Sequence, residues 1–509
     1  MLPSEIKTIK SVKSYQLVLV IQLVILLFLI LVPFLYSPNN LEFLGMLQPE
    51  QLVHSGCTFF LVLVIWSFWS WKLVTSRWFD PYLLFFLSAV LFNGGQAILE
   101  VFHLNEHGFL AGLLPEELFS YEVTLQTLYL VTLGLATLHF GALIGVIWAN
   151  QIEKKEENPK EIFSTKQFSR NAYLVGRVFL YASLLPTFLT MKNALSAVFS
   201  GGYESLFEQG GVTGVGAAPA LIAKLLFPGA FLVIATAPKN DKIRIQAVFF
   251  ILLYSAANFV LGSRNNAVMP LLAMLWLWNS VVRPIPKFFS LGILLLLSFI
   301  LPIIASTRND SGIDRFSIEF LQQAFAGIKN PIIESISEMG GSMRSVAWTM
   351  ELVPNVRPFA LGMTYLVGFM VLIPNIFGVG RHPALTISGY DIPDFWLVSE
   401  IDPDFFERGG SFGFSFIAEA FLNFGWGAPI ALGLIGLIYG KYIGWSLNDR
   451  NPVKIALAAT FASFFLFYAR QASELMIRPS IYYVLVPYLL IKFLSARAVK
   501  SSNQNIPFP

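Results

Sequence analysis

The chain has 509 residues, of which 55% are hydrophobic and 13% are charged, and its mean hydropathy is +0.65. Soluble domains carry about 25% charged residues, so this balance excludes an ordinary soluble protein and indicates a helical bundle whose outer solvent is lipid. The net charge of +3 provides no dense basic surface for nucleic acid. The single cysteine, Cys57, excludes an intramolecular disulfide and a cysteine metal site.

About twelve apolar stretches are long enough to cross a membrane, because roughly 20 residues of helix span its hydrocarbon core. The first follows Lys7, Lys10 and Lys13. Its length of about 22 residues exceeds the apolar core of a cleaved signal peptide, so we expect it to remain as the first helix. The predicted spans are residues 15–36, 52–71, 80–102, 123–149, 171–191, 217–237, 245–262, 265–282, 288–306, 414–440, 453–470 and 478–495.

Lys and Arg residues occur in every second loop between these spans. The loop 150–170 and the turn 238–244 are basic, whereas the loops 37–51 and 103–122 contain acidic residues and no Lys or Arg. Because positive residues favour the cytoplasmic side of a membrane, we expect both termini in the cytoplasm. The long segment 307–413 then lies on the outside.

The expected fold is an all-α polytopic bundle. Residues 1–306 are expected to form helices one to nine, 307–413 an external cap of short helices, 414–496 helices ten to twelve, and 497–509 a cytoplasmic tail. Within the cap, the apolar piece 361–378 is short and contains Gly and Pro, so it is expected to be re-entrant, interfacial or a broken span. No pair of interrupted helices repeats in the two halves, as an inverted-repeat transporter would require.

A set of arginines at the predicted outer boundary is the strongest chemical signal. Positive charge is normally kept on the inner side, so outer arginines need another reason. Arginine stays charged and binds phosphate through bidentate hydrogen bonds. The set therefore predicts a site for a lipid-linked diphosphate. Alternatively, each arginine pairs with an acid such as Asp310, Glu338 or Glu474, or with lipid headgroups. The set consists of Arg264, Arg308, Arg344, Arg381, Arg408, Arg470 and Arg478.

The stretch 407–425 is rich in glycine and opens the tenth predicted span. Glycines let a backbone approach a ligand, and a helix start offers free N–H groups to an anion. Glu419 and Asn423 are four residues apart and share a helix face, and Glu419 lies about one and a half turns below the outer surface. An acid there is expected to face the protein as a catalytic base, as an acceptor for sugar hydroxyls or as a structural hydrogen-bond acceptor. The glycine run begins with Gly409, Gly410 and Ser411.

The 409–425 stretch resembles the GGxGFSxIAExxxNFG pattern of Wzy-type O-antigen polymerases, also called oligosaccharide repeat-unit polymerases. Smaller pieces follow the order found in that family and extend the resemblance over the later part of the chain, whereas the first third matches only in hydropathy. Arg357 and Gly368 have a spacing found in the wider polymerase and ligase group. The smaller pieces are Gly201-Gly202-Tyr203, Gly262-Ser263-Arg264, Arg308, Glu338-Met339-Gly340 and Gly362-Met363-Thr364-Tyr365.

The resemblance implies an inverting, metal-independent glycosyltransferase of the membrane-embedded C type, without a cofactor. It would move a glycan from undecaprenyl diphosphate to the non-reducing end of another lipid-linked repeat unit, with a chain-length regulator as companion. Arginines would stabilise the leaving diphosphate, and a carboxylate would take the acceptor proton. We therefore expect Glu419, Glu338, Arg264 and Arg408 to be catalytic. The expected substrate-binding residues are Arg308, Arg344, Arg470, Arg478, Arg381, Gly409, Gly410, Ser411, Asn423, Tyr203 and Tyr365.

Other interpretations remain open. His382 would be the base if the protein used a histidine, as some related ligases do. His103 and His107 are four residues apart, as zinc ligands can be, but the glutamate of a zinc peptidase motif is missing. A transporter or flippase for lipid-linked sugars, or a non-catalytic member of an assembly complex, is a further alternative. The small number of charged residues in the predicted spans favours an enzyme.

Overall fold

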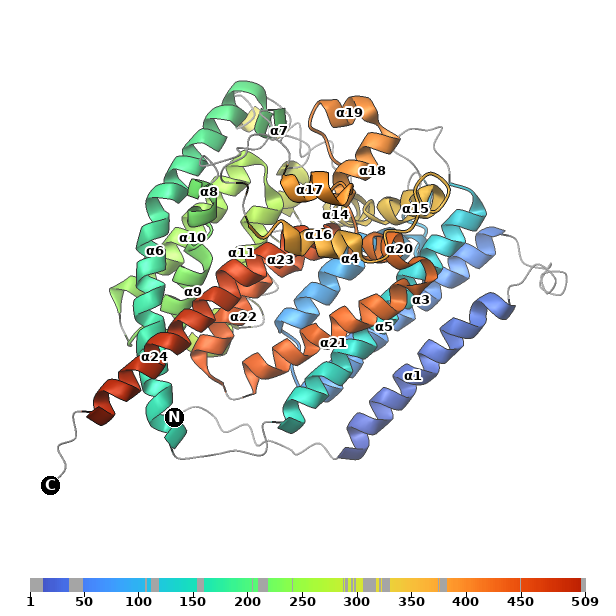
Figure 1. Cartoon of the computed structure of the whole chain (residues 1–509). Helices are drawn as coiled ribbons and strands as arrows, with labels where there is room; N and C mark the ends of the chain where they lie inside the picture. Colours follow the sequence, from blue (N-terminus) through green and yellow to red (C-terminus); the bar gives the residue numbers. More distant parts are fainter. Residues whose placement is uncertain are drawn as a thin grey trace.

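A computed structural model of the chain is a bundle of helices, and every regular element in the part that it describes is helical (Figure 1). The described part is residues 12–35, 49–105, 108–110, 119–152, 160–203, 205–208, 218–239, 241–286, 330–373, 375, 382–448 and 450–504, with short stretches between 288 and 322.

The bundle is built from long helices, several of which are continued by short 3-10 or π-helical segments. These elements are α1 (Val12–Leu35), α3 (Pro49–Thr75), α4 (Pro81–Val101), α5 (Tyr121–Ile152), α6 (Lys160–Gly201), α7 (Ser205–Glu208), α8 (Ala218–Ala223), α9 (Leu226–Thr236), α10 (Lys242–Leu261), α11 (Arg264–Leu277), η3 (Trp278–Val282), α20 (Phe416–Phe424), η5 (Gly425–Gly427), α21 (Ala428–Leu447), α22 (Pro452–Phe465), η6 (Leu466–Arg470), α23 (Glu474–Pro479), η7 (Ser480–Leu485) and α24 (Val486–Gln504).

Nine helical segments of the described chain are long and apolar enough to cross a membrane. They coincide with predicted spans, and α1 and the continuous α11–η3 segment correspond to two more of them. The predicted span 288–306 lies largely outside the described residues. The prediction of an all-helical polytopic membrane protein is therefore confirmed, whereas the number of spans stays a prediction.

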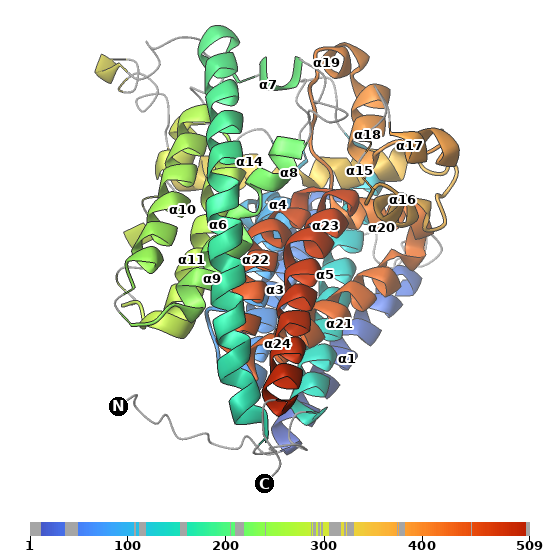
Figure 2. The ribbon, with the colours of Figure 1, turned by 60° about the vertical axis from the view of Figure 1, so that its left-hand side comes forward.

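Short helices form a cap over one end of the bundle, and the start of α1 and the end of α24 lie toward the other end (Figures 1 and 2). The helix α16 falls in the apolar piece 361–378 and has eight residues, which is too short to span a membrane. It packs against α20 and α23. The cap helices are α14 (Pro331–Gly340), α15 (Met343–Leu352), α16 (Met363–Met370), α17 (Pro383–Ser388), α18 (Pro393–Ile401) and α19 (Pro403–Glu407).

Two central helices, α5 and α21, approach so closely that their backbones touch. A Cβ atom added at Gly436 would lie 1.9 Å from the carbonyl oxygen of Leu138, and one added at Gly440 would lie 2.1 Å from that of Ala142. The hydrophobic effect does not drive helices together inside a lipid bilayer. Small residues four positions apart instead stabilise a helix pair, because they let the two backbones make close van der Waals contact. This glycine seam joins the first half of the chain to the second.

The predicted tenth span, 414–440, is not one continuous helix. α20 ends at Phe424, and the short η5 segment separates it from α21. Gly425 has φ +53° and ψ −130°, a backbone conformation that favours glycine and that redirects the chain. α20 consequently packs against the cap helices α15 and α16, while α21 runs through the bundle beside α5 (Figure 1).

Replacing Gly436 by alanine should destabilise the bundle, because the new Cβ would overlap the carbonyl of Leu138. Over-packing of this kind costs about 1–3 kcal/mol and should lower the thermal unfolding midpoint of the protein in detergent. Gly433→Ala is a matched control on the same helix, since its Cβ would meet the Thr137 oxygen at an ordinary 3.5 Å. Equal midpoints for the two variants would contradict the close approach of α5 and α21.

Candidate functional site

The glycine-rich stretch ends in a capped helix start. Ser415 is the N-cap of α20, and its Oγ accepts hydrogen bonds from the amides of Ile417 (3.1 Å) and Ala418 (3.4 Å). Gly413 has a φ of +74°, and a Cβ on it would lie 2.7 Å from Nε of Arg470. Glycine at this position therefore permits both the turn and the close approach of Arg470, while Ser415 fixes the direction in which α20 begins.

Glu419 on α20 is fully buried, and its carboxylate accepts three hydrogen bonds. Thr364 Oγ1 donates to Oε1 at 2.8 Å, Ser473 Oγ donates to Oε1 at 2.7 Å, and the Ser473 amide donates to Oε2 at 2.8 Å. The carboxylate thereby links α20 to α16 and to the turn before α23. A buried acid with this many donors is well satisfied, so the geometry favours the structural one of the roles expected for Glu419.

Asn423 extends the same network, one turn further along α20. Its Nδ2 donates to Thr364 Oγ1 at 2.7 Å and to the carbonyl oxygen of Glu419 at 2.8 Å. Its Oδ1 accepts the amide of Gly362 at 2.9 Å, at the start of α16. Glu419 and Asn423, which the sequence places on one helix face, therefore act on the same neighbouring segment.

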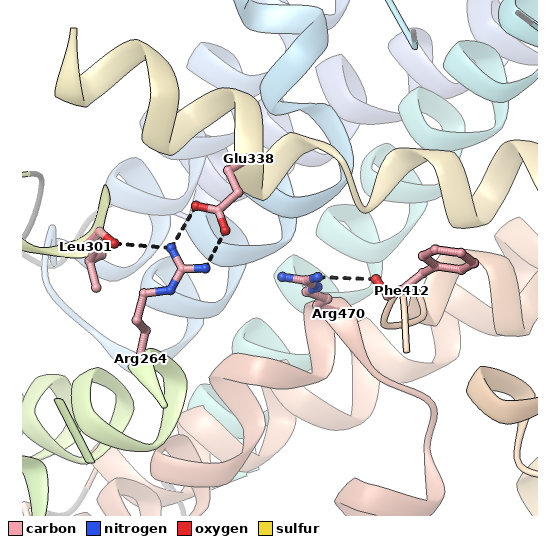
Figure 3. Close-up of polar contacts among 5 residues, drawn as sticks. All are labelled: Arg264, Leu301, Glu338, Phe412 and Arg470. Atoms are coloured by element: carbon pink, nitrogen blue, oxygen red, sulfur yellow. Dashed lines mark hydrogen bonds and ion pairs between the residues drawn. The ribbon is translucent and has the colours of Figure 1, made fainter. Parts of the chain in front are cut away.

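Two predicted arginines lie beside the cap (Figure 3). Arg264, the first residue of α11, forms an ion pair with Glu338 of α14 through both terminal guanidinium nitrogens, and also donates to the Leu301 carbonyl at 3.3 Å. Arg470, the last residue of η6, donates to the Phe412 carbonyl at 3.2 Å. Arg264 and Glu338 are thus brought together as the acid-pairing alternative expects, and Arg470 is fixed to the glycine-rich stretch.

Asp394 of α18 is an acid near this site that sequence reasoning missed. Both of its carboxylate oxygens accept from the Ser411 hydroxyl at 2.7 Å. Burial raises the pKa of Asp394, and the Ser411 hydrogen bond and the positive charge of Arg470 oppose that rise. Asp394 belongs to no recognisable motif, so only the folded cap reveals that it faces Ser411.

Two further predicted arginines have no carboxylate as a direct partner in the contacts that the structure describes. Arg408 follows α19 and lies with its guanidinium 5.9 Å from the centroid of the Phe405 ring. Arg478 of α23 donates to the carbonyl oxygen of Val371, with 3.1 Å for the bond from Nε. Because an aromatic ring and a carbonyl carry no formal negative charge, neither contact removes the capacity of these groups to bind an anion.

Of the remaining predicted arginines, only Arg344 falls within the described residues. Arg344 donates from Nε to the Gly341 carbonyl at 3.3 Å, and Arg308 and Arg381 lie outside the described residues. Tyr203 lies in the turn between α6 and α7. The structure therefore groups Arg264, Arg470 and Arg478 at the cap-side ends of core helices rather than bringing all predicted arginines together.

Tyr365 and the glycines have packing roles. The Tyr365 ring stacks on Phe424 with centroids 6.1 Å apart, and burial raises the pKa of its hydroxyl well above the usual 10. A Cβ on Gly410 would lie 2.3 Å from the ring of Phe405, so this position requires glycine for space. Gly409 has a φ of +78° and requires it for backbone conformation.

The structure gives no support to His382 as a catalytic base or to His103 and His107 as a metal site. His382 caps α17, because its Nδ1 accepts the amide of Ala384 at 3.1 Å while Nε2 donates to the Ile373 carbonyl at 2.8 Å. His107, the predicted partner of His103, lies outside the described residues. Within the portion of the chain that the structure describes, no group of three or more His, Cys, Asp or Glu side chains could hold a metal ion.

Comparison with known proteins decides the family. A family model described as O-antigen polysaccharide polymerase Wzy matches residues 18–502, nearly the whole chain. The chain belongs to the Wzy family. Wzy proteins are membrane-integral polysaccharide polymerases that act on lipid-linked oligosaccharide repeat units, which confirms the predicted resemblance and the enzyme class. No curated protein and no solved structure matches this Wzy chain.

Replacing Glu419 by glutamine should destabilise the Wzy chain. The amide can keep its acceptor oxygen at the Oε1 position, but its NH₂ group would then face the amide N–H of Ser473, which leaves a buried donor without a partner at a cost of about 1–3 kcal/mol. The expected result is a lower thermal unfolding midpoint. Glu407→Gln, at the exposed end of α19, is the control and should leave the midpoint unchanged; an unchanged midpoint for E419Q as well would refute the linking role.

Proposed function

We propose that this Wzy chain transfers a growing glycan from undecaprenyl diphosphate to the non-reducing end of a lipid-linked acceptor repeat unit. The reaction inverts the anomeric carbon, needs no metal or cofactor, and supplies O-antigen, capsule or exopolysaccharide. The observation that supports this most directly is the grouping of Arg264, Arg470 and Arg478 with buried acids at the cap end of the bundle. Guanidinium groups at a membrane boundary stabilise a departing diphosphate without a metal.

In this proposal Glu338 and Glu419, the two acids predicted to be catalytic, position other residues instead. Glu338 binds both terminal nitrogens of the Arg264 guanidinium. This ion pair fixes the orientation of the Arg264 side chain. Glu419 is a positioning residue, because its three hydrogen bonds fix the segments that carry Thr364 and Ser473. Arg408, which has no carboxylate partner among the described contacts, remains available to the substrate.

We further propose that the cap faces the periplasm or exterior and that the chain lies in the cytoplasmic membrane. The basic turns between α9 and α10 and between α21 and α22 lie toward the end of the bundle away from the cap (Figure 2), which is the distribution expected when that end is cytoplasmic. A companion chain-length regulator stays a prediction from the family resemblance.

The alternative function, a transporter or flippase for lipid-linked sugars, needs a polar path through the bilayer. The polar groups deeper in the bundle are instead bound to one another: His139 contacts the hydroxyls of Ser70 (2.7 Å) and Tyr82 (2.8 Å), and Trp71 donates to Asp80 at 2.7 Å. Saturated groups of this kind stabilise helix packing and favour the enzyme. A flux assay in proteoliposomes without added acceptor separates the two functions, since only a transporter moves substrate under that condition.

Arg264→Ala should abolish long polysaccharide chains while single repeat units still accumulate on lipid. Losing one preorganised cation at a developing charge costs about 10²–10³ in rate, and gel analysis of the polysaccharide ladder detects this directly. Arg408→Ala should have the same effect for the same reason.

Glu338→Gln provides the matched control for the Arg264 variant. It leaves the Arg264 charge in place and retains a hydrogen-bond acceptor, so we expect the rate to fall by less than about tenfold. Normal long chains from the Arg264 and Arg408 variants would reject the proposed function of these residues. Equal losses in R264A and E338Q would instead indicate that the ion pair serves only the fold.

A further inference from the structure

Glu474, the first residue of α23, is a buried acid that neither the family match nor the proposed mechanism uses. Only 6% of its surface is exposed. Neither carboxylate oxygen has a hydrogen-bond partner from another residue in the described chain. The neighbouring acid Glu419 is buried to a similar degree but has three donors. The two carboxylates therefore differ sharply in how well the protein satisfies them.

An unsatisfied buried carboxylate is costly, because the protein has replaced neither the water nor the charge that would stabilise it. Such groups concentrate at functional sites, where a ligand supplies the missing hydrogen bonds. Another unpartnered and buried oxygen, the hydroxyl of Tyr365, lies on α16, which packs against α23. Hydroxyl groups of a sugar are suitable donors to a carboxylate of this kind.

One cation, Arg478, lies beside this acid, and a second, Lys224, lies within electrostatic range of Arg478. Arg478 is four residues after Glu474, so the two side chains leave the same face of the helix, and they are within electrostatic range of each other. Arg478 donates to the Val371 carbonyl rather than to a carboxylate. Its other charged neighbour is Lys224, in the turn between α8 and α9.

Lys224 is held near Arg478 by the packing of α8 on the last span. The Tyr483 hydroxyl donates to the Leu221 carbonyl at 2.9 Å, and Thr187 donates to the Ala223 carbonyl at 3.2 Å, so the residues just before Lys224 are anchored to η7 and to α6. Among the described residues, the Lys224 ammonium makes no hydrogen bond or ion pair, and the charge that it feels most is that of Arg478. The like charges of Lys224 and Arg478 repel each other, and an anionic ligand bound between them would remove that repulsion.

We propose that Glu474, Arg478 and Lys224 form the reaction centre of the polymerase, with Glu474 as general base and the two cations as the diphosphate site. This inference rests on the proposed function and names the groups that would perform it. The acceptor hydroxyl oxygen forms a bond to the anomeric carbon of the donor glycan, and its proton passes to Glu474. The bond from that carbon to the diphosphate oxygen breaks, and the electron pair leaves with undecaprenyl diphosphate, whose charge Arg478 and Lys224 neutralise.

Access to Glu474 requires a displacement of α16. A Cβ added at Gly368 of α16 would lie 3.3 Å from the Cα atom of Glu474, so this helix covers the start of α23. α16 is short, and the exposed side chains of Leu366 and Phe369 lie on its outer side. In the proposed reaction an outward displacement of α16, which would break the hydrogen bonds of Thr364 to Glu419 and Asn423, would open the carboxylate to the acceptor and leave the α5–α21 seam closed.

The test uses the purified full-length protein in lipid, with lipid-linked repeat units as substrate and undecaprenyl diphosphate as binding probe. Glu474→Gln should lower kcat by about a hundredfold or more and leave the affinity for undecaprenyl diphosphate unchanged. Its thermal unfolding midpoint should not fall, because the change removes an unsatisfied carboxylate. This distinguishes it from E419Q, for which the midpoint should fall.

Lys224→Ala should weaken binding of undecaprenyl diphosphate by more than about tenfold, as expected for loss of a charge-assisted contact, and Lys224→Arg should restore it. Lys192→Ala, an exposed lysine on α6, is the control and should bind normally. Wild-type turnover in E474Q, a lowered midpoint in E474Q, or normal binding by K224A would overturn the inference while the wild-type chain still polymerises. A wild-type chain that turns over no lipid-linked unit would overturn the proposed function itself.

Discussion

The carboxylate of Glu419 joins three segments of the chain by hydrogen bonds, and Asn423 adds further hydrogen bonds between two of them. It binds α20 to Thr364 on α16 and to Ser473 immediately before α23. At the depth of a membrane boundary, water is scarce, so lost hydrogen bonds are not readily replaced. The relative positions of α20, of α16 and of the start of α23 therefore depend to a large extent on one acid that is itself out of contact with solvent.

The charged residues at the cap end fall into two groups. Arg264 is matched to Glu338 as a neutral pair, and such a pair contributes orientation more than stability when it is partly exposed. Arg478 donates to a carbonyl and has Glu474 and Lys224 as charged neighbours, so the two cations outnumber the one acid beside them. In the proposed function a substrate that carries a diphosphate would be drawn to the second group, and Arg264, oriented by Glu338, would add a further guanidinium for the charge that develops as the diphosphate leaves.

The amino-acid sequence is sufficient for the parts of the fold that depend on length and apolar character. The apolar runs that become α3, α4, α5 and α22 could be located because a lipid-exposed helix has no other way to satisfy its backbone. The close contact of α5 with α21 has a recognisable signal as well, since Gly436, Gly440 and Gly444 repeat every four residues.

The site is less predictable, because its geometry depends on contacts between distant segments. The break at Gly425 is not distinguishable by composition from the helical glycines of α21, so α20 and α21 were expected to be continuous. Glu419 and Asn423 could be placed on one face from their spacing, but Thr364 and Ser473 belong to residue types that occur everywhere in the chain. The proposed roles of Lys224 and Glu474 depend on their tertiary surroundings. No local sequence pattern shows that a buried carboxylate lacks a hydrogen-bond donor.

The hydrogen bonds that close the core also constrain how the protein is made. The hydroxyl of Ser88 donates to the Leu466 carbonyl at 2.7 Å across a separation of 378 residues, and Asn93 donates to the Ala469 carbonyl across 376. During synthesis α4 enters the membrane long before η6 leaves the ribosome, so for most of that time Asn93 lacks this acceptor and the glycine seam of α5 has no α21 to fill it. Until then Asn93 can donate only within its own helix, as it does to the Ala89 carbonyl at 3.0 Å, so the core closes only when almost the last helix has been inserted.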